Sequence, residues 1–183
     1  LRDTFVNIIT RFFPTIEADS PLYNALAISS IILVSVIIYF FARLVVRPQI
    51  ASWVTRTNNR WDNALQTHGF FRRLMHLFPA LFIFLITPVL IHEESLLQGM
   101  LIKGSQLYML YSGLLGIFAL LSTIEDVYNA SAFSRRAPIT GFIQVAKLTV
   151  AILTILFSIS LIVDRSPLIL VSGLTAIAAV LLL

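Results

Sequence analysis

Three histidines are the first side chains in this sequence whose type could support catalysis or metal binding. They are His68, His76 and His92, and only His92 has carboxylates beside it, at Glu93 and Glu94. A metal site needs three or four converging ligands, and no two of these histidines have the i, i+4 spacing that puts ligands on one helix face. The pattern favours ordinary interfacial histidines, so we expect no metal and no cofactor.

The adjacent carboxylates Glu125 and Asp126 are the second candidate, because paired carboxylates can share acid–base work. They fall where an apolar segment ends, which favours a solvated helix end instead. The chain contains no cysteine, which excludes disulfides and thiolate chemistry. We therefore expect that the protein is not an enzyme.

Lys147 is the third candidate, since ionisable residues inside apolar segments often mark proton or ion relays. It follows Phe142 by five positions, a distance of about 8 Å along a helix. Its long side chain can reach the nearer membrane surface from there. Snorkelling therefore explains Lys147 better than a relay does.

These residues are set in a strongly apolar chain. Of its 183 residues, 58% are hydrophobic and 12% are charged, and the mean hydropathy is +0.91. A soluble domain has about half apolar and about a quarter charged residues. Lipid must therefore act as the solvent for much of this chain, and we expect membrane lipids rather than nucleic acid as partners.

Five apolar segments predict an all-α membrane protein with five transmembrane helices. The first four make up a region over residues 22–167, with helices at about 22–46, 74–91, 104–124 and 142–163. The fifth begins at residue 168 and is still apolar at 183, so we expect the chain to be a piece of a longer protein. In the preceding segment, residues 1–21, the apolar side chains of residues 1–13 predict a short helix on the membrane surface.

Lysine and arginine are distributed unequally between the two sides of these helices. Seven lie in the segments after the first and third helices: Arg47, Arg56, Arg60, Arg72, Arg73, Arg135 and Arg136. Four lie in the opposite segments: Arg2, Arg11, Lys103 and Arg165. Arg43 and Lys147 lie within helices near the richer side. The richer side is predicted to be cytoplasmic, which places the N-terminus outside the cytoplasm.

Two tryptophans lie among the basic residues of the first cytoplasmic segment, at Trp53 and Trp61. Their amphipathic rings suit the headgroup level of a bilayer. We expect Trp53, Trp61, Arg43 and Lys147 to anchor helix ends in the lipid interface. The alternative is a solvated loop that happens to contain two tryptophans.

The fifth segment concentrates small residues in its middle, which allow helices to approach closely. These residues are Ser172, Gly173, Thr175, Ala176, Ala178 and Ala179. The helix could pack inside a monomeric bundle or around a symmetry axis against copies of itself. Composition alone leaves both arrangements open.

Several local stretches together resemble a known family. They are Arg60–Leu65, Phe70–Ala80, Ser134–Ile139, Gln144–Lys147 and Ser172–Ala179. These stretches, in this order and at these places in the predicted topology, resemble the MscS-like mechanosensitive ion channels, specifically the five-helix miniconductance (YbdG-type) group of Gram-negative bacteria. The resemblance covers about residues 53–183, and the first 50 residues resemble the group only in hydropathy.

The resemblance implies a homoheptameric channel of the bacterial inner membrane that opens under membrane tension and protects against hypoosmotic shock. In that family the last transmembrane helix lines the pore through which ions permeate, and the preceding helices sense tension. The family continues into a cytoplasmic β-domain and a vestibule, which this sequence does not include.

Steps of three or four residues from Ser172 reach Thr175 or Ala176, then Ala179, then Leu183. Channel gates are often hydrophobic constrictions that close by dewetting, so we predict that this stripe lines the pore. The resemblance implies gate positions at Ala179 and Leu183. Ala179 is smaller than the family's usual residue, so we expect the seal at Leu183 or below it. The alternative is a stripe that only packs neighbouring subunits.

A secondary transporter is the alternative function. Transporters usually contain internal repeats and helices broken near the membrane midplane. No repeat relates the two halves of this sequence, and the only internal prolines, Pro79 and Pro88, lie near the ends of one segment. A membrane enzyme is a third alternative, supported only by Glu125 and Asp126.

The predicted topology can be tested with single cysteines, because these 183 residues contain none. In whole cells, an impermeant thiol reagent should label a cysteine at Gln98, in the predicted periplasmic segment, and should not label one at Thr57. Labelling at Thr57 without labelling at Gln98 would overturn the orientation.

Overall fold

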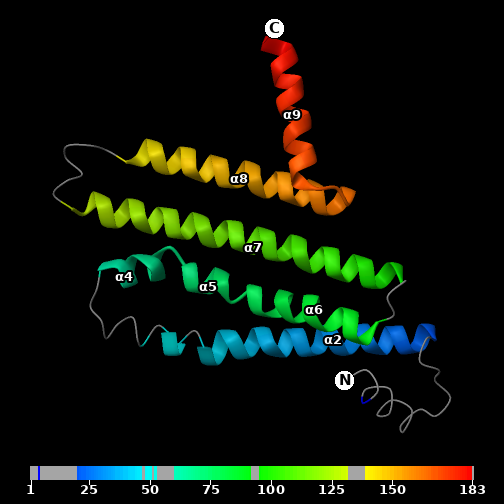
Figure 1. Cartoon of the computed structure of the whole chain (residues 1–183). Helices are drawn as coiled ribbons and strands as arrows, with labels where there is room; N and C mark the ends of the chain where they lie inside the picture. The colour runs from blue at the N-terminus through cyan, green and yellow to red at the C-terminus, as the bar shows by residue number, and fades with distance from the viewer. Residues whose placement is uncertain are drawn as a thin grey trace. The chain divides into compact units, whose positions relative to one another are not determined.

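The computed structural model describes residues 20–46, 48–50, 60–91, 95–131 and 139–182, together with Thr4 and Ser52. For Leu174, Ile177, Ala178 and Leu181 it describes the backbone alone. Every regular element in this part of the chain is a helix, which confirms the all-α prediction (Figure 1). The chain forms two compact units, residues 1–50 with 74–109 and residues 51–73 with 110–183.

In the first unit, helix α2 (Pro21–Phe41) packs along α6 (Leu77–Leu90), and the first part of α7 (Leu96–Asn129) follows. Ser20 caps the N-terminus of α2, and its hydroxyl accepts a hydrogen bond from the Tyr23 N–H at 3.2 Å. Pro21 suits the first turn because its missing N–H would have no partner there. At its other end α2 runs into a short π-helix, η1 (Ala42–Val46).

A small core holds α2 against α6. Tyr23, Ala27 and Ile31 recur every four residues on one face of α2 and are at most 2% exposed. Leu90 and Ile91 complete the cluster. The buried Tyr23 hydroxyl donates to the Leu90 carbonyl at 3.1 Å, which gives this phenol a partner where water is absent.

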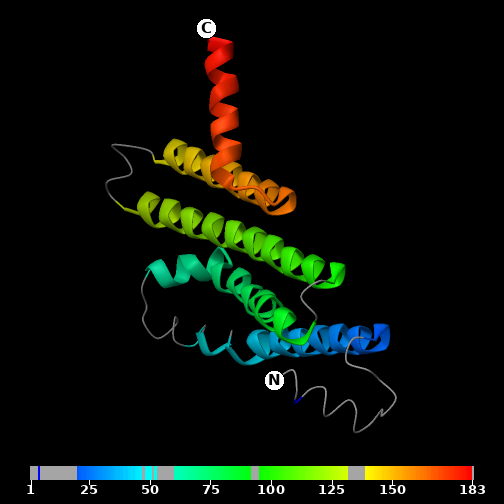
Figure 2. The same ribbon diagram turned by 45° about the vertical axis from the view of Figure 1, so that its right-hand side comes forward.

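The second unit contains α4 (Arg60–Thr67), α5 (Phe70–Leu74), the remainder of α7, α8 (Thr140–Val163) and α9 (Pro167–Leu182). Gly69 turns the chain between α4 and α5 with φ = 67°, a conformation that glycine adopts without steric cost. Asp164 ends α8 with φ = 54°, and the Ser160 hydroxyl donates to the Arg165 carbonyl across the turn. Helix α9 then turns away from α8 (Figures 1 and 2).

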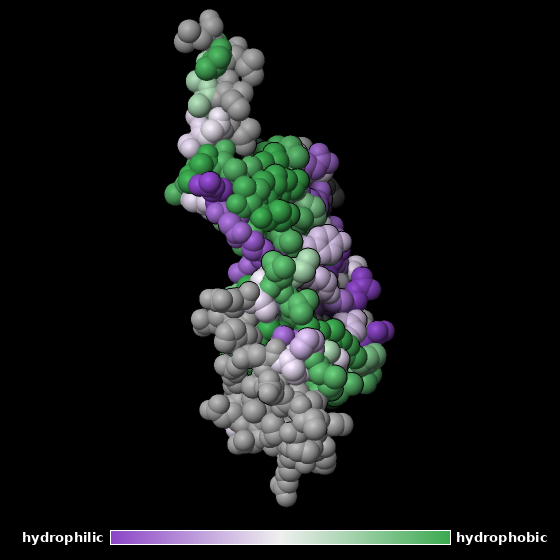
Figure 3. Space-filling view, turned by 90° about the vertical axis from the view of Figure 1, so that its right-hand side faces the viewer, coloured by the Kyte–Doolittle hydropathy of each residue, from purple (hydrophilic) through white to green (hydrophobic). Residues whose placement is uncertain are grey.

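Four helical segments of the described chain are long and apolar enough to cross a membrane. They are Pro21–Ile50, Phe70–Leu90, Leu96–Asn129 and Thr140–Val163. No more than 22% of the apolar window of each is buried, and only 6% in the last. Large apolar areas accordingly appear on the outside of the chain (Figure 3). These findings support the predicted transmembrane character. Helix α9 has 16 described residues, and a fifth span and the orientation stay predictions.

The second and third segments differ from the predicted helices. A turn at Met75–His76 separates α5 from α6 within the segment predicted as one helix over 74–91. Pro79 accounts for this break, because a proline ring clashes with the carbonyl four residues earlier in a continuous helix. Helix α7 has 34 residues, about 51 Å, so it is longer than a hydrocarbon core of about 30 Å.

The structure also improves the topology test. The Gln98 side chain is 7% exposed and donates to the Ile91 carbonyl at 3.2 Å, so a cysteine at Gln98 would be shielded from a reagent. Leu96 is 87% exposed in the same part of α7 and is the better labelling position.

Tyr23→Phe should weaken the pairing of α2 with α6, because it leaves the Leu90 carbonyl without its hydroxyl donor. We expect a loss of about 0.5–1.5 kcal/mol in the free energy of unfolding, measured by denaturing-detergent titration in mixed micelles. Tyr111→Phe is the matched control, since Tyr111 is 58% exposed. Equal shifts in the two variants would contradict a structural role for the Tyr23 hydroxyl.

Candidate functional site

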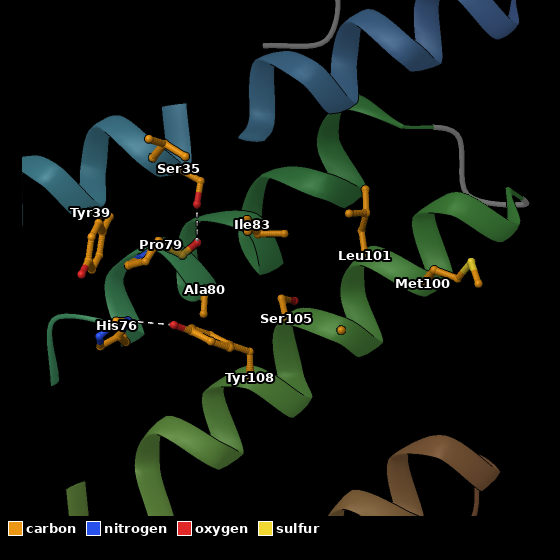
Figure 4. Close-up of a pocket in the computed structure, with 12 residues that line it drawn as sticks. Ser35, Tyr39, His76, Pro79, Ala80, Ile83, Met100, Leu101, Ser105 and Tyr108 are labelled. Carbon is orange, nitrogen blue, oxygen red and sulfur yellow. Dashed lines mark hydrogen bonds between the residues drawn. The ribbon is translucent and has the colours of Figure 1, made fainter. Parts of the chain in front are cut away.

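A cavity of about 490 Å³ lies in the first unit, between α2, the start of α6 and the first part of α7 (Figure 4). This volume falls within the range of about 300–1,000 Å³ typical of small-molecule and cofactor sites. Its lining is Ser35, Val36, Tyr39, His76, Pro79, Ala80, Ile83, Met100, Leu101, Gly104, Ser105 and Tyr108.

Aromatic and polar side chains gather at one end of the cavity. His76 lies between Tyr39 of α2 and Tyr108 of α7 (Figure 4). The His76 Nδ1 and the Tyr108 hydroxyl are 2.7 Å apart and share a hydrogen bond. The Tyr39 and His76 rings lie with their centroids 5.2 Å apart. This contact connects the turn before α6 to both neighbouring helices.

The remainder of the cavity is apolar. The Ser35 hydroxyl donates to the Pro79 carbonyl at 3.4 Å, and the Ser105 hydroxyl donates to the Ile102 carbonyl at 2.8 Å. Both hydroxyl donors are therefore used on the protein backbone. A Cβ added at Gly104 would meet no heavy atom within 4 Å, so this glycine contributes open space.

In the second unit, Arg73 ties α5 to the interior of α7. Its Nη1 donates to the Leu115 carbonyl at 2.6 Å, and the Ser112 hydroxyl donates to the Arg73 carbonyl at 3.0 Å. The sequence-based count placed Arg73 in a cytoplasmic loop, whereas the structure places it in a helix within the candidate span Phe70–Leu90. A guanidinium at that depth is costly unless its donors are paired, and the Leu115 carbonyl pairs one of them.

Two further contacts hold α4 beside the end of α7. His68 Nε2 lies 2.5 Å from Asp126 Oδ2, and Arg60 Nη1 donates to the Ala130 carbonyl at 3.4 Å. A cation suits that carbonyl because the helix dipole is negative at a helix C-terminus. The His68 and Asp126 side chains are 27% and 56% exposed, so the pair stabilises the fold by no more than about 1 kcal/mol.

Glu125 and the adjacent Asp126 have different partners. The Glu125 Oε2 lies 3.9 Å from Lys147 Nζ on α8, and the two side chains are 19% and 28% exposed. Asp126 fits the predicted solvated helix end, but Glu125 and Lys147 form an ion pair between α7 and α8. The two carboxylates therefore do not converge on one site.

The predicted pore stripe lies on α9. The side chains of Ser172, Thr175, Ala176 and Ala179 are exposed, and the main contacts of α9 within the chain are with α8. The Ser172 hydroxyl donates to the Ile169 carbonyl and the Thr175 hydroxyl to the Val171 carbonyl, each at 2.9 Å. Leu183 lies outside the described residues, and the pore-lining role stays a prediction.

Of the predicted anchors, Arg43 is exposed in η1 and Trp61 is 45% exposed on α4. Trp53 lies outside the described residues, as do His92, Glu93, Glu94 and most of the predicted surface helix over 1–13. The described part of the chain contains no group of three histidine, aspartate or glutamate side chains able to hold a metal ion.

Sequence reasoning missed the cavity and the contacts of Arg73. Tyr39, His76 and Tyr108 are separated by more than 30 positions each, so only the packing of the helices reveals their proximity. Gly104 and the proline break at Met75 are the local signals that could have indicated an opening between helices.

Arg73→Met should release α5 from α7, because methionine keeps an unbranched apolar chain but has no donor for the Leu115 carbonyl. We expect amide hydrogen exchange over residues 60–74 to become at least about fivefold faster, the effect of losing roughly 1 kcal/mol of local stability. Arg72→Met is the control, since Arg72 is exposed and adjacent. Equal acceleration in both variants would show that the Arg73 bond does not hold α5.

No protein-family model matches this sequence, and no solved structure matches the chain. Function must therefore be inferred from the residues and their geometry.

Proposed function

We propose that this chain is the membrane-sensing and pore-entry part of a tension-gated ion channel in a bacterial inner membrane, where it protects cells against hypoosmotic shock. In this proposal α2, α5–α6, α7 and α8 are the sensor helices, and α9 is the start of a fifth, pore-lining helix. The N-terminus is periplasmic, and several copies, seven by the family resemblance, surround the pore.

The exposed small-residue face of α9 carries the proposal. Ser172, Ala176 and Ala179 lie along one side of this helix and are exposed within the chain. Small side chains offer lipid little apolar surface but allow close approach between helices. Copies of α9 around a common axis would cover this face, and the resemblance of Ser172–Ala179 to the channel family points the same way.

The other helices have the exposure that a tension sensor requires. Their apolar windows are at most 22% buried, so lipid contacts dominate over contacts between helices. Arg43, Trp61 and Lys147 would hold helix ends at the interface, together with Trp53, which lies between Arg43 and Trp61 in the sequence. A helix held in this way tilts or shifts when the bilayer thins, because its apolar length no longer matches the core.

The broken α5–α6 segment and the adjacent cavity favour a secondary transporter as the second candidate. Transporter sites lie at helix breaks near the midplane. Here the break at Met75–His76 comes after only five residues of the candidate span Phe70–Leu90, about 8 Å from its end. This off-centre position makes the channel the better proposal.

Patch-clamp recording of the full-length protein separates the two candidates. Stretch-activated current steps support the channel, whereas substrate-dependent flux without such steps would replace it with the transporter.

Ala179→Asn should make the channel open more easily, because an amide helps water to enter a constriction that closes by dewetting. We expect the open probability at resting tension to rise about tenfold, equal to about 1.4 kcal/mol. Leu181→Asn, two positions away and off the pore stripe, is the control. Leak from the Leu181 variant, with no change in the Ala179 variant, would mean that the opposite face of α9 lines the pore.

A further inference from the structure

We propose that His68 and Asp126 form a pH-dependent clasp, which holds α4 on the C-terminal end of α7 more tightly when His68 is protonated. Acid strengthens this clasp and alkali loosens it, over the pH range in which histidine changes its charge. In the predicted topology this end of α7 is cytoplasmic, so the clasp would respond to cytoplasmic pH. The inference depends on contacts within the second unit and not on the channel proposal.

Helix α4 depends on polar contacts for its position. It lies beside the C-terminal end of α7 in both ribbon views (Figures 1 and 2). None of its eight residues is buried, so apolar packing contributes little to its docking. Arg60, its first residue, donates to the Ala130 carbonyl at 3.4 Å. His68, which directly follows the helix, lies 2.5 Å from Asp126, so contacts with α7 hold α4 at both ends.

The Asp126 carboxylate determines which nitrogen of His68 carries a proton. An ionised carboxylate only accepts hydrogen bonds, so the Nε2 that faces it must be the donor. In the neutral ring Nδ1 then has no proton, and it is the atom that binds one as the pH falls. The bond to Asp126 is kept, but its donor becomes a positively charged ring. Because charge-assisted hydrogen bonds are the stronger ones, acid strengthens the clasp.

Other charged groups around the clasp have partners of their own. The Arg60 and Arg73 guanidiniums donate to backbone carbonyls of α7. Lys147 pairs with Glu125. Among the described residues, the charged side chains of α4, α5, α8 and this end of α7 are Arg60, Asp62, Arg72, Arg73, Glu125, Asp126 and Lys147.

Arg72 is the positive charge that opposes protonation of His68. Its guanidinium lies within 4 Å of the position that a Cβ on Gly69 would occupy, next to His68 in the chain. Arg72 is exposed, so water and salt screen its repulsion. The Asp126 carboxylate is in direct contact with the ring, and its attraction is therefore the larger effect.

The exposure of the pair suits a switch better than a permanent contact. The His68 side chain is 27% exposed and that of Asp126 is 56% exposed, so protons reach the ring from water. At this exposure an ion pair changes an equilibrium by no more than roughly fivefold. An effect of this size adjusts how often α4 leaves α7 and does not lock it in place.

The test measures amide hydrogen exchange of the full-length protein in lipid nanodiscs at about pH 8 and about pH 5.5, on either side of the histidine range. Each rate is divided by the intrinsic rate at the same pH, so the protection factor is free of the chemical effect of pH on exchange. Protection over residues 60–67 should rise about threefold to fivefold at the lower pH. Residues 150–160 of α8 serve as the reference, and equal protection there in every variant shows that the fold is kept.

His68→Gln separates charge from hydrogen bonding, because the glutamine amide still donates to Asp126 but gains no charge. Its protection over residues 60–67 should stay, at both pH values, near the level that the unsubstituted protein has at the higher pH. Asp126→Asn, which keeps an acceptor without the charge, should be equally insensitive to pH. Glu125→Gln is the matched control: it neutralises the adjacent carboxylate, whose partner is Lys147, and should keep the full response.

Two results would overturn the proposal at once: no rise in the unsubstituted protein, or an equal rise in His68→Gln. Loss of the response in Glu125→Gln would also overturn it, because the response would then belong to the overall charge at the end of α7 and not to the contact between His68 and Asp126.

Discussion

Polar groups must find partners without water, and this constraint determines most of the structure. In a bilayer the backbone can meet it only by forming helices or closed barrels. Side chains meet it in the same way here: the hydroxyls of Ser29, Thr154 and Ser158 each donate to the carbonyl four residues earlier. The described residues contain no buried side-chain nitrogen or oxygen without a partner. The resulting helices are internally complete and depend little on one another.

Helices of this kind gain little by packing together, because lipid is as apolar as the surface that they would bury. Beside the small apolar core between α2 and α6, polar contacts position them, such as the Tyr23 hydroxyl on the Leu90 carbonyl and Arg73 on the Leu115 carbonyl. Each of these two contacts joins a side chain to a backbone carbonyl, and the Glu125–Lys147 pair joins a side chain to one opposite charge. A structure held by so few contacts can change shape in response to its bilayer, which is the property that a tension sensor needs.

The sequence predicted the helical class and the approximate place of four candidate spans, because both follow from apolar runs long enough to cross a bilayer. Its errors have local causes. Pro79 lies inside an apolar run, and hydropathy alone does not show that the helix breaks at Met75. Helix α7 has 34 residues, 13 more than predicted, because residues 96–103, which include Gln98, Gly99 and Lys103, and residues 125–129, which include Glu125 and Asp126, interrupt the apolar run but continue the helix.

The contacts of individual polar residues could not be predicted in the same way. Lys147 and Glu125 were interpreted separately, as a snorkelling side chain and a solvated helix end. Their positions on different helices become close only after α7 and α8 are placed side by side. His76 likewise gave no signal until Tyr39 and Tyr108 were seen around it. Sequence periodicity shows which residues share a face of one helix. A site between helices depends on which faces of several helices meet, and periodicity does not show that.

The hydroxyls of α9 bear on whether its small-residue face packs helices together or lines water. The Ser172 hydroxyl donates to the Ile169 carbonyl and the Thr175 hydroxyl to the Val171 carbonyl. This face therefore offers few free hydrogen-bond donors to a water column or to a neighbouring helix. A neighbouring backbone can then approach closely without leaving a polar group unsatisfied. For the same reason, water in a narrow passage beside this face would find few donors, which favours dewetting. In the proposed channel, packing and gating would place the same demand on these residues, and the size of the side chain at each level, small at Ala176 and Ala179, would determine how wide the passage becomes.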